Sequence, residues 1–288
     1  MSNMKTFLKK EYNKFTLERF PNIYRPDSLP FISGDTFRKF SHHVFDETQS
    51  FNPKKVKNNE IIFINSDLIE IFFKIQDPKI QNKYILISHN SDKSPNKEEL
   101  GLINEKIVHW FVQNLEFSSF DRISCLPIGL ENKRWLRNSI KNSNSSVISK
   151  SKLILCSFNE YNNYPVRKLV LDIADKNSCV EIKKFENTNK YYKELGNYKF
   201  ILCPPGNGPD THRIWESLIH KTFPIFELNP FTENLQTLKV PAIYLDSWKD
   251  LDNYSKKELS KKYEHLLTFE LDMIYFEYWK NQISTKFL

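Results

Sequence analysis

The chain has 288 residues, of which 40% are hydrophobic and 23 are phenylalanine, so it can bury one large core or two of ordinary size. No segment approaches the roughly 20 apolar residues of a membrane-spanning helix, and the first fifteen residues lack the apolar centre of a secretion signal, so we expect a soluble, cytoplasmic protein. A net charge of +7 suits an anionic partner such as a nucleotide, but a solvated basic surface explains it equally well.

The first regular elements are predicted between Glu60 and residue 128. Short apolar runs predict strands at 61–65, 84–88 and 123–128. Helices are predicted between them at 67–74 and 105–115, the second because apolar residues recur at helical spacing at Ile107, Val108, Phe111 and Leu115. The order β-α-β-α-β indicates a parallel sheet with helices on its faces.

A second alternation follows the polar, Ser/Asn-rich segment 139–151, which is predicted to link two domains. Strands are expected at 153–156, 180–182, 200–203, 222–226 and 242–245, and helices at 166–175, 189–195, 256–267 and 269–283. The predicted fold class is therefore α/β, with one Rossmann-like domain at 1–140 and another at 141–255. Helices within 256–288 are expected to pack back across both through an aromatic seam.

The most informative stretch is 198–226, where a strand, a Gly/Pro-rich turn, a helix and a strand follow one another. Backbone N–H groups in such a turn can bind an anion, and Asp210 or Thr211 is expected to cap the helix. Arg213 and Glu216 share a face of that helix. An arginine there can hold a diphosphate and a carboxylate can accept ribose hydroxyls, but a Gly/Pro loop with a surface Arg–Glu pair explains the spacing as well.

This stretch resembles the C-terminal motif of exostosin-like glycosyltransferases, in which a P-x-G-x-G turn precedes an R-x-W-E helix and a P-I strand. The matching residues are Cys203 to Gly208, Arg213-Ile214-Trp215-Glu216 and Pro224-Ile225, although Lys221-Thr222 replaces the glycine usual before the last strand. The resemblance extends from about Phe31, through an S-G-D-x-F-R block, to Leu245. It implies GT-B architecture, two Rossmann-like domains facing a cleft, with the donor bound by the second and the acceptor by the first.

Within the S-G-D-x-F-R block, Gly34 permits a turn with positive φ. Asp35 is expected to cap a helix that continues through Phe37 and Phe40.

Candidate proton acceptors follow the strand at 84–88 directly. His89-Asn90-Ser91-Asp92 resembles an H-N-S-D block of the same transferases, and its side chains are expected to reach the cleft. A carboxylate or imidazole can deprotonate an acceptor hydroxyl, so Asp92 and then His89 are the candidate bases. A helix cap for Asp92 and a structural role for His89 are the competing interpretations.

In the second half, Arg167 and Asn159 stand in an F-N-x-x-T-N-x-x-x-R block that is partly kept, with Asn162-Asn163 in place of Thr-Asn. A cation at a helix N-terminus is unfavourable unless an anion is present, which indicates a diphosphate partner for Arg167. The DxD pattern of metal-dependent transferases is absent, and the histidines show no ligand spacing. No metal and no cofactor is expected, and the resemblance implies the same.

The sequence thus predicts a hexosyl- or pentosyltransferase that uses a UDP- or GDP-linked sugar and a glycan, glycoprotein or glycolipid acceptor. Inversion at the anomeric carbon is what the resemblance implies. The expected donor site contains Gly206, Asn207, Gly208, Asp210, Arg213, Glu216, Arg167 and Asn159. A non-catalytic nucleotide- or glycan-binding module is the alternative. A nucleic-acid binder is disfavoured because no aromatic-interleaved basic stripe is present.

Overall fold

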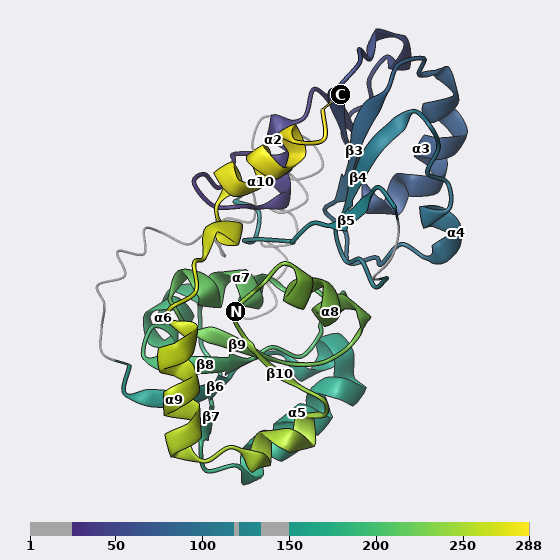
Figure 1. Cartoon of the computed structure of the whole chain (residues 1–288). Helices are drawn as coiled ribbons and strands as arrows, with labels where there is room; N and C mark the ends of the chain where they lie inside the picture. The colour runs from purple at the N-terminus through teal and green to yellow at the C-terminus, as the bar shows by residue number, and fades with distance from the viewer. Residues whose placement is uncertain (1–24, 118–120, 134–149, 288) are drawn as a thin grey trace, which may run out of the picture.

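A computed structural model describes residues 25–117, 121–133 and 150–287, in which two five-stranded sheets form the frame (Figure 1). Every strand pair within each sheet is parallel. The predicted α/β class with two Rossmann-like parallel sheets is therefore confirmed. Most of the linker expected at 139–151 lies outside the described residues.

The first sheet has its strands in chain order. They are β1 (His43–Phe45), β2 (Glu60–Asn65), β3 (Tyr84–His89), β4 (Ile107–Val112) and β5 (Ile123–Cys125). The central strand β3 is buried at every position, and Ile87 on it lies between Phe63 of β2 and Phe111 of β4. A strand covered on both faces is apolar throughout instead of alternating.

The helix predicted at 105–115 is wrong, because this segment forms β4. Five of the six residues of β4 are buried. A continuous apolar run in the middle of a parallel sheet places apolar residues at every offset, helical offsets included. The β-branched and aromatic residues Ile107, Val108, Trp110 and Phe111 favour the extended conformation that the structure shows.

Different elements cover the two faces of the first sheet. All its crossovers run in one direction, so right-handed connections place the intervening helices on one face. These helices are α3 (Ile69–Ile75) and α4 (Lys97–Leu100), whereas α2 (Gly34–Phe40) and α10 (Phe276–Ser284) lie on the other side (Figure 1). The rings of Phe37 and Phe40 on α2 pack against Phe276 at centroid distances of 5.9 and 5.2 Å.

The start of α2 differs from the expectation. Ser33 caps the helix by accepting a hydrogen bond from the Thr36 N–H, and Asp35 lies buried within the first turn. Gly34 has helical φ, so the predicted positive-φ turn is wrong. Its lack of a side chain serves close packing instead, because a Cβ there would lie 1.7 Å from Asn90 Oδ1.

The second sheet has the order β10-β9-β8-β6-β7. Its strands are β6 (Lys152–Cys156), β7 (Val180–Ile182), β8 (Tyr198–Leu202), β9 (Phe223–Glu227) and β10 (Ile243–Leu245). The chain leaves β6 toward β7 on one side and then crosses to β8 on the other. This reversal is a topological switch point, where loops part and ligands bind in open α/β sheets.

We call the first sheet with α2, α3 and α4 the first unit, and the second sheet with its helices the second unit. The helices of the second unit are α5 (Tyr164–Lys176), α6 (Thr188–Leu195), α7 (His212–Ile219), α8 (Pro230–Thr237) and α9 (Lys256–Leu266). The 3₁₀ helices of the chain are η2 (Pro53–Lys55), η3 (Ser66–Leu68), η4 (Asp77–Lys79), η5 (Glu160–Asn163), η6 (Trp248–Asn253) and η7 (Asp272–Ile274). Helix α8 was not predicted, although Asn229 caps it and Pro230 occupies its first position.

The C-terminal segment runs from the second unit to the first. Tyr263 of α9 packs its ring against Phe200 and Phe223 of the second sheet. The single helix predicted at 269–283 is wrong, because η7 ends at Ile274 and Tyr275 is extended before α10 begins. This break lets the Phe276 N–H donate to the Pro30 carbonyl beside the first sheet.

Among the described residues, no helix is both long and apolar enough to cross a membrane. Cys125, Cys156 and Cys203 are buried free thiols, and Cys179 is a partly buried one.

Candidate functional site

A cavity of about 1070 Å³ lies at the carboxyl end of the second sheet. Loops after β6, β7 and β8 and the first turns of α5 and α7 line most of it, and Asp92 and Ile128 reach it from the first unit. Its position matches the switch point between β6 and β8. The two units therefore share this pocket.

The turn after β8 is tight because of its two glycines. The Gly206 N–H donates to the Gly208 carbonyl oxygen at 2.9 Å. A Cβ on Gly206 would lie 2.9 Å from Arg167 Nη2, and one on Gly208 would lie 2.8 Å from the Asp92 carbonyl oxygen. The glycines therefore admit an arginine on one side and the first unit on the other.

Arg167 is 3% exposed and holds this turn against the loop after β6. Its Nε–H donates to the Pro205 carbonyl at 2.8 Å, and Nη1 donates to the Asn159 carbonyl at 2.6 Å. Burial, and then the nearby charge of Arg213, lower the pKa of Arg167 to about 10. Its hydrogen bonds are structural, while the guanidinium charge still faces the pocket.

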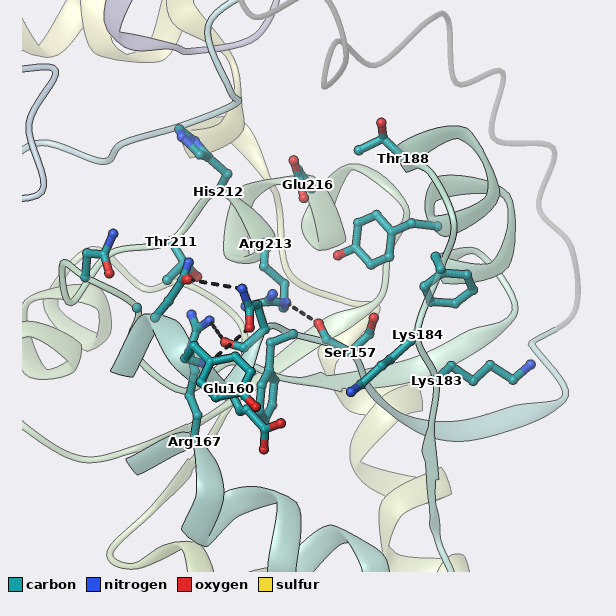
Figure 2. Close-up of a pocket in the computed structure, with 18 of the residues that line it drawn as sticks. Ser157, Glu160, Arg167, Lys183, Lys184, Thr188, Thr211, His212, Arg213 and Glu216 are labelled. Atoms are coloured by element: carbon teal, nitrogen blue, oxygen red, sulfur yellow. Dashed lines mark hydrogen bonds between the residues drawn. The ribbon is translucent and has the colours of Figure 1, made fainter. Parts of the chain in front are cut away.

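Arg213 lies beside Arg167 and comes from the first turn of α7. Its Nε–H donates to the Ser157 carbonyl oxygen at 3.0 Å (Figure 2). Both guanidinium groups lie over the ring of Phe158, 5.4 Å away for Arg167 and 5.7 Å for Arg213. Within residues 25–117, 121–133 and 150–287, neither arginine has a carboxylate within 4.0 Å.

The N-terminus of α7 faces the pocket without a capping side chain. Thr211 before α7 makes no side-chain cap hydrogen bond, and the first turn of α7 carries no acidic residue. Thr211 Oγ1 and Tyr191 Oη also line the pocket and are buried without a hydrogen-bond partner in the described chain. Unpaired donors at the positive ends of helices favour an anion.

Glu216 lies on α7 with Arg213 and also lines the pocket. It is 8% exposed, and its Oε1 accepts a hydrogen bond from the Tyr192 hydroxyl at 2.7 Å. Burial raises the pKa of this carboxyl. The predicted spacing of Arg213 and Glu216 therefore places both side chains at one cavity.

Asp210 lines the pocket, but both oxygens of its carboxylate accept hydrogen bonds from the protein. Oδ2 accepts from the Ile128 N–H at 2.7 Å, and Oδ1 accepts from Trp215 Nε1 at 2.9 Å. Burial raises the pKa of this carboxyl to about 7. Because Ile128 belongs to the first unit, Asp210 joins the two units, and we propose no contact with a ligand for it.

The two predicted bases lie in different surroundings. Asp92 is exposed at the pocket, and its Oδ2 accepts from Asn207 Nδ2 of the turn at 3.1 Å. His89 is 1% exposed and does not line the pocket. Its Nδ1 accepts from the Asn90 N–H at 2.7 Å and its Nε2–H donates to the Pro127 carbonyl at 3.1 Å, so neither nitrogen can receive a substrate proton.

Asn159 also lines the pocket, where its side chain accepts from the Tyr161 N–H at 3.2 Å and caps η5. Sequence reasoning missed Phe158, although it directly precedes Asn159 in the block discussed for Arg167. It also missed His212, whose Nδ1 lies 2.7 Å from the Gly129 carbonyl oxygen. The position of His212 beside Arg213 at the start of a helix could have indicated that His212 belongs to the site.

Among the described residues, no three His, Cys, Asp or Glu side chains are grouped as ligands for a metal ion.

No protein-family model and no curated protein sequence matches this chain. Solved structures with a similar course of the chain include the spinosyn rhamnosyltransferase SpnG, with 8% identity over 79% of this chain and 68% of that one and a TM-score of 0.39. AviGT4, a glycosyltransferase involved in avilamycin A biosynthesis, has 10% identity, coverage of 88% and 77%, and a TM-score of 0.37. An alpha-glucosyltransferase in complex with UDP-glucose and DNA containing an abasic site has 11% identity, coverage of 84% and 90%, and a TM-score of 0.33.

Proposed function

We propose that this protein is a glycosyltransferase that moves a sugar from a nucleotide-diphosphate donor to a glycan or glycoconjugate. The exostosin-like motifs around Arg213 and Glu216 support this activity, and they also support inversion at the anomeric carbon. The donor is UDP- or GDP-linked. The units around the two sheets bind acceptor and donor respectively, in line with the domains expected at 1–140 and 141–255.

The observation that carries the proposal is the arginine pair over Phe158. Two neighbouring cations repel each other, and burying a cation without a counter-charge costs free energy. Protein carboxylates normally offset such a cost. Among the described residues none lies within 4.0 Å of Arg167 or Arg213, although Glu216 acts on Arg213 from further away. A diphosphate would supply the missing negative charge and accept several charge-assisted hydrogen bonds at once.

The uncapped start of α7 supports the same ligand, because its N–H groups and dipole favour phosphate oxygens. The Gly206 to Gly208 turn lets the ligand approach the backbone, and Glu216 is placed to accept hydroxyl groups of a sugar or ribose. Fixed cations of this kind can stabilise a leaving diphosphate without a metal ion. Donor binding is therefore proposed to be metal-independent.

The experiment is calorimetric titration of UDP and GDP, in excess chelator, into the protein and its Arg213→Ala variant. We expect at least tenfold weaker binding for the variant, because a charge-assisted hydrogen bond contributes about 1.5–3 kcal/mol. Lys190→Ala is the matched control, since Lys190 pairs with Glu186 at the surface and does not line the cavity. Equal affinity of the protein and Arg213→Ala, or binding that requires added magnesium or manganese, would contradict the proposed donor site.

Transfer itself is tested by incubating the protein with UDP- and GDP-sugars and measuring release of the nucleotide. Slow hydrolysis of one donor is the expected result without an acceptor. Nucleotide binding with no release from any donor favours a non-catalytic module. Asp92 is the base that the sequence predicts, and the transfer rate of its Asn variant tests that role.

A further inference from the structure

A histidine that sequence reasoning passed over lies where the two units meet at the pocket. His212 is the first residue of α7 and lines the cavity next to Arg213. Its side chain is 28% exposed, in contrast to the fully buried His89. In Figure 2 His212 projects from the upper side of the pocket while Arg213 points down toward Ser157. Both side chains line the cavity, and they point in different directions from the first turn of α7.

The tautomer of His212 follows from its partner. Nδ1 lies 2.7 Å from the carbonyl oxygen of Gly129, and a carbonyl oxygen can only accept a hydrogen bond. Nδ1 therefore carries the proton. In the neutral ring Nε2 has a free lone pair, which is what a general base requires.

A carboxylate stands beside that nitrogen. Glu131 Oε1 lies 3.6 Å from His212 Nε2, and the Glu131 side chain is 22% exposed. A negative charge at this distance stabilises an imidazolium once the ring has taken a proton.

Hydrogen bonds fix both the Gly129 carbonyl and the start of α7, which together position the His212 ring. Gly129 has φ of 69°, and the peptide unit that carries its carbonyl is held by the Leu130 N–H, which donates to the Ile32 carbonyl oxygen at 2.9 Å. On the other side, Asp210 ties the start of α7 to Ile128 and to Trp215. Asp92, in comparison, is exposed and already accepts a hydrogen bond from Asn207.

From this geometry we infer that His212, oriented by the Gly129 carbonyl and assisted by Glu131, is the general base of the reaction. The inference rests on the proposed transfer with inversion. The acceptor hydroxyl gives its proton to Nε2 while its oxygen forms a bond to the anomeric carbon. The bond from that carbon to the phosphate oxygen breaks, and its electron pair leaves with the nucleoside diphosphate.

The test compares His212→Asn, His212→Ala and Asp92→Asn with the unaltered protein, using the UDP- or GDP-sugar that is turned over. In His212→Asn the amide nitrogen can replace Nδ1 as donor to the Gly129 carbonyl, but nothing replaces Nε2. We expect kcat to fall by about 10²–10⁴-fold. Unfolding temperature and UDP affinity should stay near those of the unaltered protein, and KM for the donor should change little.

Added imidazole should restore part of the turnover of His212→Ala, which a purely structural role of His212 would not allow. Turnover of His212→Asn within threefold of the unaltered protein would overturn the inference while leaving the transferase intact. A large loss in Asp92→Asn alone would transfer the role to Asp92. Absence of turnover in the unaltered protein counts against the proposed function itself, and the inference is then overturned with it.

Discussion

The carboxyl ends of the two sheets differ in how their polar groups are satisfied. At the first sheet, the chain's own groups pair with one another. The Asp35 N–H donates to Asn132 Oδ1, Asn132 Nδ2 donates to Asn90 Oδ1, and Asn90 Nδ2 donates to Asp35 Oδ1. At the second sheet, two arginines and the start of α7 meet around a cavity without such closure.

Strand order accounts for part of this difference. The first sheet winds in one direction only, so it has no switch point, and α2 packs at the edge where a ligand would otherwise lie. The second sheet reverses direction between β6 and β8, and its loops part there. In the H-N-S-D block, the Asn90 side chain is therefore part of a closed hydrogen-bond network, whereas the guanidinium groups of Arg167 and Arg213 lie together over Phe158 at the pocket.

The largest effect is expected for the free energy of unfolding at acid pH, which depends on the buried His89 at the carboxyl end of the first sheet. Burial lowers the pKa of His89 to about 4, whereas an unfolded chain has the ordinary value of 6.5. As pH falls from 6.5 to 4 the unfolded form binds a proton that the folded form does not, so stability falls. The loss from His89 is about 3 kcal/mol, and no further loss arises below pH 4, where both forms are protonated.

Replacing His89 by Gln should remove that contribution. Urea unfolding at several pH values should show a shallower decline between pH 6.5 and 4 than in the unaltered protein, even if the variant is less stable at pH 7. His109 and His220, whose pKa values burial also lowers to about 4, remain in both proteins and cancel in the comparison. An unchanged decline would mean that His89 is not held neutral.

The next effect concerns the close packing at the same edge. Gly34→Ala would place a methyl group 1.7 Å from Asn90 Oδ1 and 2.7 Å from His89 Nδ1. Overpacking of this kind costs about 1–3 kcal/mol, and the network must shift. Gly196→Ala is the matched control, because its nearest heavy atom is His220 Nδ1 at 3.8 Å and its φ is −58°.

Urea denaturation should show destabilisation for Gly34→Ala and little change for Gly196→Ala, with UDP affinity retained in both. Equal stability of the two variants would show that the carboxyl end of the first sheet can accommodate a methyl group at residue 34. The contrast between a filled and an open sheet edge would then lose its basis.

The smallest effect is expected where the two edges touch. The hydrogen bond from Asn207 to Asp92 is exposed to solvent. We expect Asp92→Ala to change the free energy of unfolding by less than about 0.5 kcal/mol, as for most exposed substitutions. Chemical denaturation at neutral pH measures it. A loss above about 1 kcal/mol would show that this contact holds the units together.

Much of the fold was predictable because short apolar runs are bounded by turn residues. Strands β2, β3, β6 and β7 and helix α5 lie within a few residues of the predicted ranges. The helix predicted at 105–115 was wrong because the burial of five of the six residues of β4 removes the alternation that identifies a strand. Helix α8 was missed although its Asn229-Pro230 start is a recognisable signal.

The candidate site divides in the same way. Arg213, Glu216 and the glycine turn are neighbours in sequence, so local spacing was enough to place them together. The position of Phe158 under both arginines depends on how α5 and α7 approach each other. The pairing of His212 with Gly129 depends on contact between the units. The spacing of residues along the chain therefore could not predict either the contact of Phe158 with the arginines or that of His212 with Gly129.

The return of the C-terminal segment to the first unit has a consequence for synthesis. Phe276 packs against Phe37 and Phe40 of α2, and Trp279 and Ile283 of α10 are buried at 2% and 0% exposure. During translation these residues emerge only after the whole second sheet has been made. Domains often fold as they leave the ribosome, N-terminal first. Here the apolar surface of the first unit that α10 covers stays exposed until α10 has been translated. A chaperone that shields this surface would therefore have to stay bound to the N-terminal part of the nascent chain until synthesis is nearly finished.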